Sequence, residues 1–145
     1  MAENATQALA PTALAPTKID HLGIAVASID RALEFYRDQL GLSVAHRETV
    51  DVEKVHAAML PIGESRIELL EATDADSVIA KFLAKRGEGL HHVAVKVPDL
   101  DASVAKLKAA GAHVLNDPRP GAGGHIYSFV HPASTGGVLL ELIQE

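Results

Sequence analysis

Two histidines and two glutamates stand at matching places in the chain, and their side chains are of the types that bind divalent metal ions. His21 lies in "DHLGIAV" and His92 in "GLHHVAV", and both stretches alternate like strands. Glu68 lies in "RIELLE" and Glu141 in "VLLELI", where a lone carboxylate is costly to bury unless it is paired. Two imidazoles and two carboxylates suit a divalent transition metal with octahedral preference and open positions.

An internal repeat explains the matching places. Residues 20–35 align with residues 91–107, and each stretch reads as an alternating strand followed by a capped helix. Ser28 and Asp99 are the predicted N-caps of the two helices. The stretches "MLPIGESRIELLE" and "FVHPASTGGVLLELI" also match, because each has a turn with proline and then an apolar strand with one glutamate. Each copy is therefore predicted to fold as β-α-β-β-β.

The repeat predicts an α+β fold, in which two βαβββ modules form a cupped, mostly antiparallel sheet around the metal site. Module one spans residues 18–72 and module two spans residues 89–144, with a linking helix at residues 76–87. Residues 1–17 consist mainly of alanine, threonine and proline and are predicted to form a flexible tail. Residues 18–145 would then form a single domain of ordinary size.

The composition argues against several classes of protein. Apolar residues make up 48% of the 145 residues, which is enough to form a core. The net charge is −6 and no basic run occurs, so nucleic acid is not an expected partner. No apolar stretch reaches the roughly 18 residues needed to span a membrane. The absence of cysteine favours a reducing compartment and predicts a cytoplasmic protein.

Taken in order along the chain, the motifs resemble those of the vicinal oxygen chelate superfamily and, within it, the methylmalonyl-CoA epimerases. The resemblance covers residues 18–144 and rests on "DHLGIAV", "EFYRDQLG", "IELLE", "DSVIAKFL", "GLHHVAV", "GAGGHIYSFVHP" and "GGVLLEL". It implies the glyoxalase-like fold, with His21, Glu68, His92 and Glu141 as metal ligands. It also implies cobalt(II) as the metal, with manganese, nickel, magnesium or zinc as alternatives, and a homodimer.

The activity implied by the resemblance is the interconversion of (R)- and (S)-methylmalonyl-CoA in propionate metabolism. An α-proton would be removed and returned on the other face of the carbon, through an enolate that the metal stabilises as a Lewis acid. Some members of the family have a catalytic glutamate at the position of Ala57 in this chain. Because that glutamate is missing here, the candidates for the acid–base groups are Glu141, Glu48 and His56.

Substrate-binding residues follow from the same resemblance. The loop "PGAGG" resembles the family's substrate loop, and its candidates are Gly121, Gly123 and Gly124. Lys81 is a basic candidate for the CoA end of the thioester substrate.

Two other functions are compatible with this kind of sequence. A glyoxalase I-like lactoylglutathione lyase would use the same metal ligands on a glutathione hemithioacetal. A metal-free small-molecule-binding protein of the same fold would typically line its pocket with aromatic side chains, but aromatic residues make up only 3% of this chain. The motifs "DSVIAKFL" and "FVHP" favour the epimerase.

Overall fold

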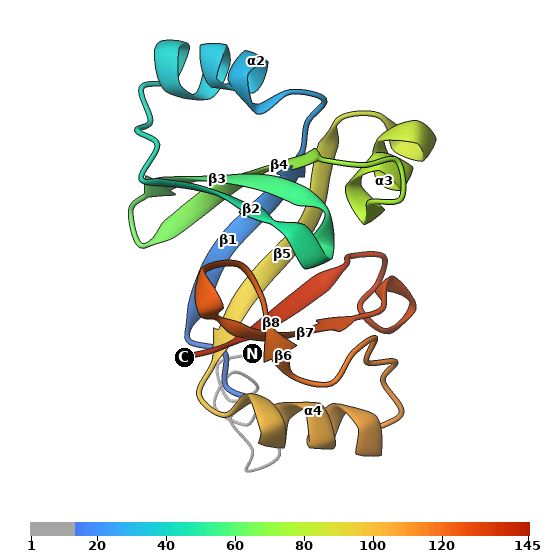
Figure 1. Cartoon of the computed structure of the whole chain (residues 1–145). Helices are drawn as coiled ribbons and strands as arrows, with labels where there is room; N and C mark the ends of the chain where they lie inside the picture. Colours follow the sequence, from blue (N-terminus) through green and yellow to red (C-terminus); the bar gives the residue numbers. More distant parts are fainter. Residues whose placement is uncertain (1–13) are drawn as a thin grey trace.

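A computed structural model describes residues 14–145 and contains one strongly curved sheet of eight strands (Figure 1). The strands lie in the order β2-β3-β4-β1-β5-β8-β7-β6, so that the two halves of the sheet mirror each other in strand order. This arrangement confirms the predicted cup. The strands are β1 (Lys18–Ala25), β2 (His46–Val50), β3 (Val55–Ile62), β4 (Ser65–Ala72), β5 (Gly89–Val97), β6 (Arg119–Pro120), β7 (Ile126–Val130) and β8 (Leu140–Gln144).

Strand pairing within each half follows the β-α-β-β-β order. The first strand of each module pairs in parallel with the last, β1 with β4 and β5 with β8, because a helix and two strands intervene. The other pairs are antiparallel, including the β1–β5 pair that joins the modules. The predicted mostly antiparallel sheet is therefore confirmed.

Each of the three α-helices begins at a side chain that accepts a hydrogen bond from the first turn, as N-caps do. Ser28 and Asp99 cap the helices of the two modules, as the repeat predicts. Ser77 caps the linking helix, and its side chain accepts from the N–H of Ile79. The helices are α2 (Ile29–Leu33), the π-helical turn η1 (Glu34–Gln39), α3 (Val78–Arg86) and α4 (Leu100–Ala109), with short 3-10 turns η2 (Asp51–Glu53), η3 (Ala122–Gly124) and η4 (Pro132–Ser134).

The helices α2 and α4 cover the outer face of the sheet, one helix on each half. Ile29 and Leu33 of α2 pack into one buried cluster with residues of β3 and β4. Leu100 and Val104 of α4 pack into an equivalent cluster with residues of β5, β7 and β8. Because α2 and α4 cover the outer face of both halves, the concave face of the sheet is left for the candidate site.

The helix of module one does not keep α-helical winding after Leu33. The chain changes from α-helical to π-helical winding at Glu34, and a π-turn holds more residues per turn than an α-helix, so that the side chains no longer follow the 3.6-residue spacing. Leu40, which follows this turn, is 50% exposed although it is apolar.

Most of the predicted N-terminal tail, residues 1–13, lies outside the described residues. The last part of the tail does contact the domain. Leu14 packs against the buried cluster under α4, and the backbone N–H of Thr17 donates to the carbonyl of Lys96. Among residues 14–145, no helix combines the length and the apolar character that a membrane crossing needs.

Candidate active site

Four neighbouring strands at the centre of the sheet each contribute one side chain to the concave face. His21 comes from β1, Glu68 from β4, His92 from β5 and Glu141 from β8, and these strands lie side by side in the order β4-β1-β5-β8. His21 is 4% exposed, and Glu68 and His92 are each 5% exposed. The structure thus brings together all four residues that the sequence repeat singles out.

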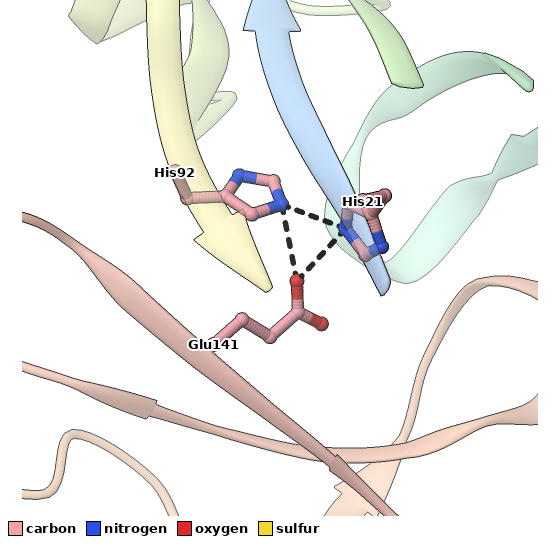
Figure 2. Close-up of side chains that lie close together, drawn as sticks. All are labelled: His21, His92 and Glu141. Carbon is pink, nitrogen blue, oxygen red and sulfur yellow. Dashed lines mark hydrogen bonds and ion pairs between the residues drawn. The ribbon is translucent and has the colours of Figure 1, made fainter. Parts of the chain in front are cut away.

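Ring nitrogens and carboxylate oxygens of these residues converge on one point. Nε2 of His21 lies 3.0 Å from Nε2 of His92, and Oε1 of Glu141 lies 3.2 Å and 3.0 Å from these two nitrogens (Figure 2). Oε1 of Glu68 lies 3.3 Å from the His21 nitrogen and 3.6 Å from the His92 nitrogen. Ligand atoms of His21, His92 and Glu141 all lie within 4.8 Å of one another, as a shared metal ion would require.

The hydrogen bond that Nδ1 of His21 makes with Asp20 shows which ring nitrogen is protonated and which one faces this point. Nδ1 of His21 lies 2.8 Å from Oδ2 of Asp20, and the ionised carboxylate can only accept a hydrogen bond. Nδ1 therefore carries a proton, and Nε2 faces Glu68, Glu141 and His92. Lone pairs facing each other at 3.0–3.6 Å repel unless a cation lies between them. The donor set therefore fits a divalent metal ion.

The charges around the site favour a positive charge at this point. Burial alone would lower the pKa of His21, but hydrogen bonds to Asp20, Glu141 and Glu68 raise it to about 11. Burial alone would raise the pKa of Glu141, but hydrogen bonds from His21 and His92 lower it to about 2. Without a metal ion the site holds a proton in its place, so that metal and proton compete for the same donors.

A glycine makes room for the second imidazole. Gly23 on β1 lies opposite His92 in the β1–β5 pairing, and the ring of His92 lies over the Gly23 backbone. A Cβ atom at position 23 would lie only 2.1 Å from Cε1 and 2.7 Å from Nε2 of His92. The close approach of the His92 ring to the backbone of β1 therefore depends on glycine at position 23.

The four side chains form part of the wall of a cavity of about 330 Å³, a volume typical of small-molecule sites. The rest of the wall is mostly apolar and comes from both modules and from α3, including Val55, Ala57, Met59, Leu70, Val78, Ile79, Phe129 and Ile143. The cavity therefore combines a polar patch of two histidines and two glutamates with a mostly apolar wall.

A second polar group in the cavity wall connects the two modules. The Tyr127 hydroxyl of β7 donates to Oε1 of Glu53 in η2 at 2.5 Å and accepts from Nε of Arg119 at 2.9 Å. Burial and the hydrogen bond to Glu53 raise the pKa of Tyr127 to about 12, so that the phenol stays neutral. All three residues line the cavity.

The structure separates the three candidate acid–base residues. Glu141 lines the cavity, whereas Glu48 and His56 do not. Glu48 pairs with Ala57 across β2 and β3, which places it on the concave face, but its carboxylate is bound to His46 at 3.0 Å. His56 lies on the other face, where its Nδ1 is 2.7 Å from Oγ1 of Thr49, because alternate residues of a strand face opposite sides.

The four predicted substrate-binding residues also lie in different places. Gly121 lines the cavity and packs closely against the ring of Tyr127. Gly123 and Gly124 belong to the adjoining turn η3 and lie outside the cavity wall, as does Lys81, whose side chain is exposed on α3. The basic side chains that do line the cavity are Arg66 and Arg119.

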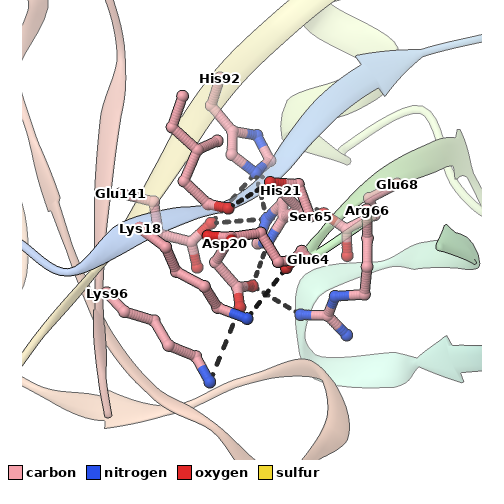
Figure 3. Close-up of polar contacts among 11 residues, drawn as sticks. Lys18, Asp20, His21, Glu64, Ser65, Arg66, Glu68, His92, Lys96 and Glu141 are labelled. Atoms are coloured by element: carbon pink, nitrogen blue, oxygen red, sulfur yellow. Dashed lines mark hydrogen bonds and ion pairs between the residues drawn. The ribbon is translucent and has the colours of Figure 1, made fainter. Parts of the chain in front are cut away.

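Sequence reasoning missed the residues around Asp20. Asp20 is only 3% exposed, and Nη2 of Arg66 donates to the same carboxylate oxygen that contacts His21 (Figure 3). Burial alone would raise the pKa of Asp20, but hydrogen bonds from His21 and Arg66 hold it well below its ordinary range. The one signal in the sequence was an acidic residue, Asp20, directly before the histidine of the first strand.

The fold and the site define a class of protein. The chain belongs to the glyoxalase/bleomycin resistance protein/dioxygenase superfamily, whose sequence pattern matches residues 20–129. The mouse mitochondrial methylmalonyl-CoA epimerase is 36% identical over 129 residues, covering 88% of this chain and 72% of that protein. An ethylmalonyl-CoA/methylmalonyl-CoA epimerase of Cereibacter sphaeroides is 35% identical over 130 residues, covering 88% of this chain and 97% of that protein.

A solved structure shows the same relationship in three dimensions. A variant of the Streptomyces coelicolor methylmalonyl-CoA epimerase, in complex with 2-nitronate-propionyl-CoA, matches with a TM-score of 0.86 and 43% identity. The match covers 90% of this chain and 99% of that chain. These comparisons confirm the resemblance to methylmalonyl-CoA epimerases that the motifs predict.

Proposed function

We propose that this protein is a metal-dependent methylmalonyl-CoA epimerase. The observation that carries the proposal is the convergence of His21, Glu68, His92 and Glu141 in the wall of one cavity. Relatives that match over most of this chain are named for acting on methylmalonyl-CoA, and one solved relative holds a CoA thioester analogue. A small CoA thioester is therefore the proposed substrate class.

The four side chains would hold the metal ion, and cobalt(II) is the first choice, with manganese, nickel, magnesium or zinc as alternatives. A divalent cation in this position supplies Lewis-acid stabilisation of the negative charge that develops on a thioester oxygen when the α-proton leaves. A malonyl thioester offers two oxygens that an ion held by these four side chains would bind. The apolar part of the cavity would exclude water from the reacting carbon.

Glu141 is the proposed base for one face of the substrate. Its Oε1 contacts both imidazoles, and its other carboxylate oxygen points away from them (Figure 2). Because Glu141 is ionised at neutral pH, that second oxygen could take up the α-proton. Glu48 is the proposed group for the opposite face. It pairs with Ala57, which lines the cavity, so that Glu48 lies on the concave face beside the cavity wall.

The test is the exchange of the substrate's α-proton with deuterium, followed by proton NMR in D₂O. Metal-stripped protein is compared with the same protein after addition of cobalt(II), and samples without protein serve as controls. The proposal expects exchange only with protein and metal together, and loss of exchange in His92→Gln. If the wild-type protein binds cobalt(II) but does not accelerate exchange, the epimerase proposal for this substrate is wrong.

The same samples separate the alternative functions. Turnover of a glutathione hemithioacetal without exchange on methylmalonyl-CoA would assign a lactoylglutathione lyase. A protein that binds neither cobalt(II) nor the other four metals would belong with the metal-free binding proteins of this fold. The homodimer and the cytoplasmic location stay predictions.

A further inference from the structure

Two β-bulges interrupt the central β1–β5 pairing, and each bulge holds the residue before a site histidine. Ile19 pairs with Val95 and His21 with Ala94, so that Asp20 is the extra residue on β1. The second bulge lies on the partner strand. Gly23 pairs with His92 and Ile24 with Leu90, so that His91 is the extra residue on β5. Asp20 and His91 also occupy equivalent positions in the internal repeat.

The bulges change which side chains can meet. In a regular strand, neighbouring residues point to opposite faces, and a residue could not contact the ring of the residue that follows it on the other face. A bulge places two consecutive residues opposite one partner residue and turns the extra side chain toward its neighbour. In this chain Asp20 Oδ2 lies 2.8 Å from His21 Nδ1, and His91 Nδ1 lies 2.9 Å from His92 Nδ1.

We propose that Asp20 and His91 are paired positioning residues, which hold the Nδ1 proton of His21 and of His92 and thereby turn both Nε2 lone pairs toward the metal centre. Each would accept the hydrogen bond that fixes one imidazole in the required tautomer and orientation. The inference rests on the metal centre of the proposed function and adds the residues that prepare it.

The two positioning residues differ in charge. Asp20 is a carboxylate held between His21, Nη2 of Arg66 and, at 3.8 Å, Nζ of Lys96 (Figure 3). His91 is an imidazole that packs edge-on against Phe82 of α3. A carboxylate makes the neighbouring imidazole a stronger electron donor than a neutral acceptor does, so the effect of removing Asp20 should be the larger.

The experiment measures the affinity for cobalt(II) by calorimetric titration of full-length protein variants. At each position one variant removes the acceptor and a second retains one: Asp20→Ala with Asp20→Asn, and His91→Phe with His91→Gln. Asp101→Asn and His113→Gln repeat such changes at exposed positions of module two and serve as controls. Thermal unfolding of each variant checks that it is folded.

The proposal expects roughly 10- to 100-fold weaker binding in Asp20→Ala and His91→Phe, with the two acceptor-retaining variants closer to wild type and the controls unchanged. Wild-type cobalt(II) affinity in both Asp20→Ala and His91→Phe would overturn the proposal. Equal losses of affinity in the acceptor-free and the acceptor-retaining variant at each position would also overturn it. If wild-type protein itself binds no cobalt(II), the metal centre fails, and that result is distinct from a failure of the positioning residues.

A second measurement needs no substitution. Proton–nitrogen correlation spectra of the zinc-loaded wild-type protein report which ring nitrogen of each histidine carries the proton. The proposal expects protonated Nδ1 in both His21 and His92. A proton on Nε2 of either ring would overturn it.

Discussion

At the scale of single residues, the geometry of the site depends on small side chains as much as on the two histidines and two glutamates that converge. Gly23 lets the ring of His92 lie over β1, and Ala57 adds only a methyl group to the cavity wall. His91 is kept neutral, because burial and the neighbouring His92 lower its pKa to about 4, and a neutral ring can accept a hydrogen bond. The geometry of the centre is thus set by what surrounds the four converging side chains.

Replacement of Gly23 by alanine is expected to displace His92 from the centre. The added Cβ would lie 2.1 Å from Cε1 of His92, so the ring or the strand must move. We expect at least about tenfold weaker cobalt(II) binding, measured by calorimetry, and a loss of about 1–3 kcal/mol in unfolding free energy from overpacking. Gly63→Ala, in a turn with open space, is the control for metal affinity. Unchanged affinity in Gly23→Ala would contradict the described packing.

The metal-free protein is expected to lose stability as the pH rises above neutral. The pKa of His21 is raised from 6.5 to about 11, so its contribution is complete below pH 6.5 and is lost as the pH rises through 11. The pKa of Glu141 is lowered from 4.5 to about 2, so its contribution is present above pH 4.5 and is lost as the pH falls through 2. Both contributions are complete between about pH 4.5 and 6.5.

Urea unfolding of metal-free protein at pH 5.5 and pH 8.5 checks this expectation. The unfolding free energy should be lower at pH 8.5, and His21→Gln should reduce the difference. Cobalt(II) affinity should change in the opposite direction and increase with pH, because the metal replaces the proton on His21. Equal stability of the metal-free protein at both pH values would show that His21 holds no proton there.

At the scale of secondary structure, the elements that carry no site histidine still shape the cavity. The helix α3 links the modules and contributes Val78 and Ile79 to the cavity wall. Its start is fixed by Ser77, which is 1% exposed and whose Oγ accepts from the N–H of Ile79 at 3.1 Å. The wall of the cavity at this side therefore depends on one buried cap.

Ser77→Ala is expected to lower the unfolding free energy by about 1 kcal/mol, because loss of an N-cap side chain leaves a backbone N–H without its partner. Urea unfolding measures the change, and Ser43→Ala at an exposed loop position is the control. Hydrogen exchange should become faster in the first turn of α3. Identical stabilities of the two variants would show that the cap contributes nothing.

The elements were largely predictable from the sequence, whereas some of the residues at the site were not. Alternation and helical spacing predict the strands of His21 and His92 and the caps of their helices, because these are local patterns. The role of Asp20 was not predictable, since strand alternation places it away from His21 and only a bulge brings the two together. The contact of Glu53 with Tyr127 joins residues 74 apart, which only the curvature of the sheet brings close.

At the scale of the whole molecule, the candidate metal site lies between the two modules. Module one supplies His21 and Glu68, and module two supplies His92 and Glu141. A bound ion would therefore hold the halves of the sheet together, in addition to the β1–β5 pairing and the hydrogen bonds of Tyr127.

Removal of the metal is expected to lower the thermal stability of the wild-type protein. Binding to the folded state alone stabilises it by about 2.7 kcal/mol when the free metal is at 100 times its dissociation constant. Thermal unfolding with added cobalt(II) and with excess chelator measures the difference. His92→Gln should show a much smaller difference, and an equal response of the two proteins would place the bound ion elsewhere.

The two ends of the described chain meet on β5, which has a consequence for the order of the modules. Thr17 donates from its Oγ1 to Glu145 at 2.6 Å, and the backbone N–H groups of both residues donate to carbonyls of β5. A circularly permuted chain that starts at residue 76, passes from Glu145 through a short glycine linker to Thr17, and ends at residue 73 should therefore fold and bind cobalt(II). In such a chain the second module would be synthesised first, and the centre would still receive one histidine and one glutamate from each half.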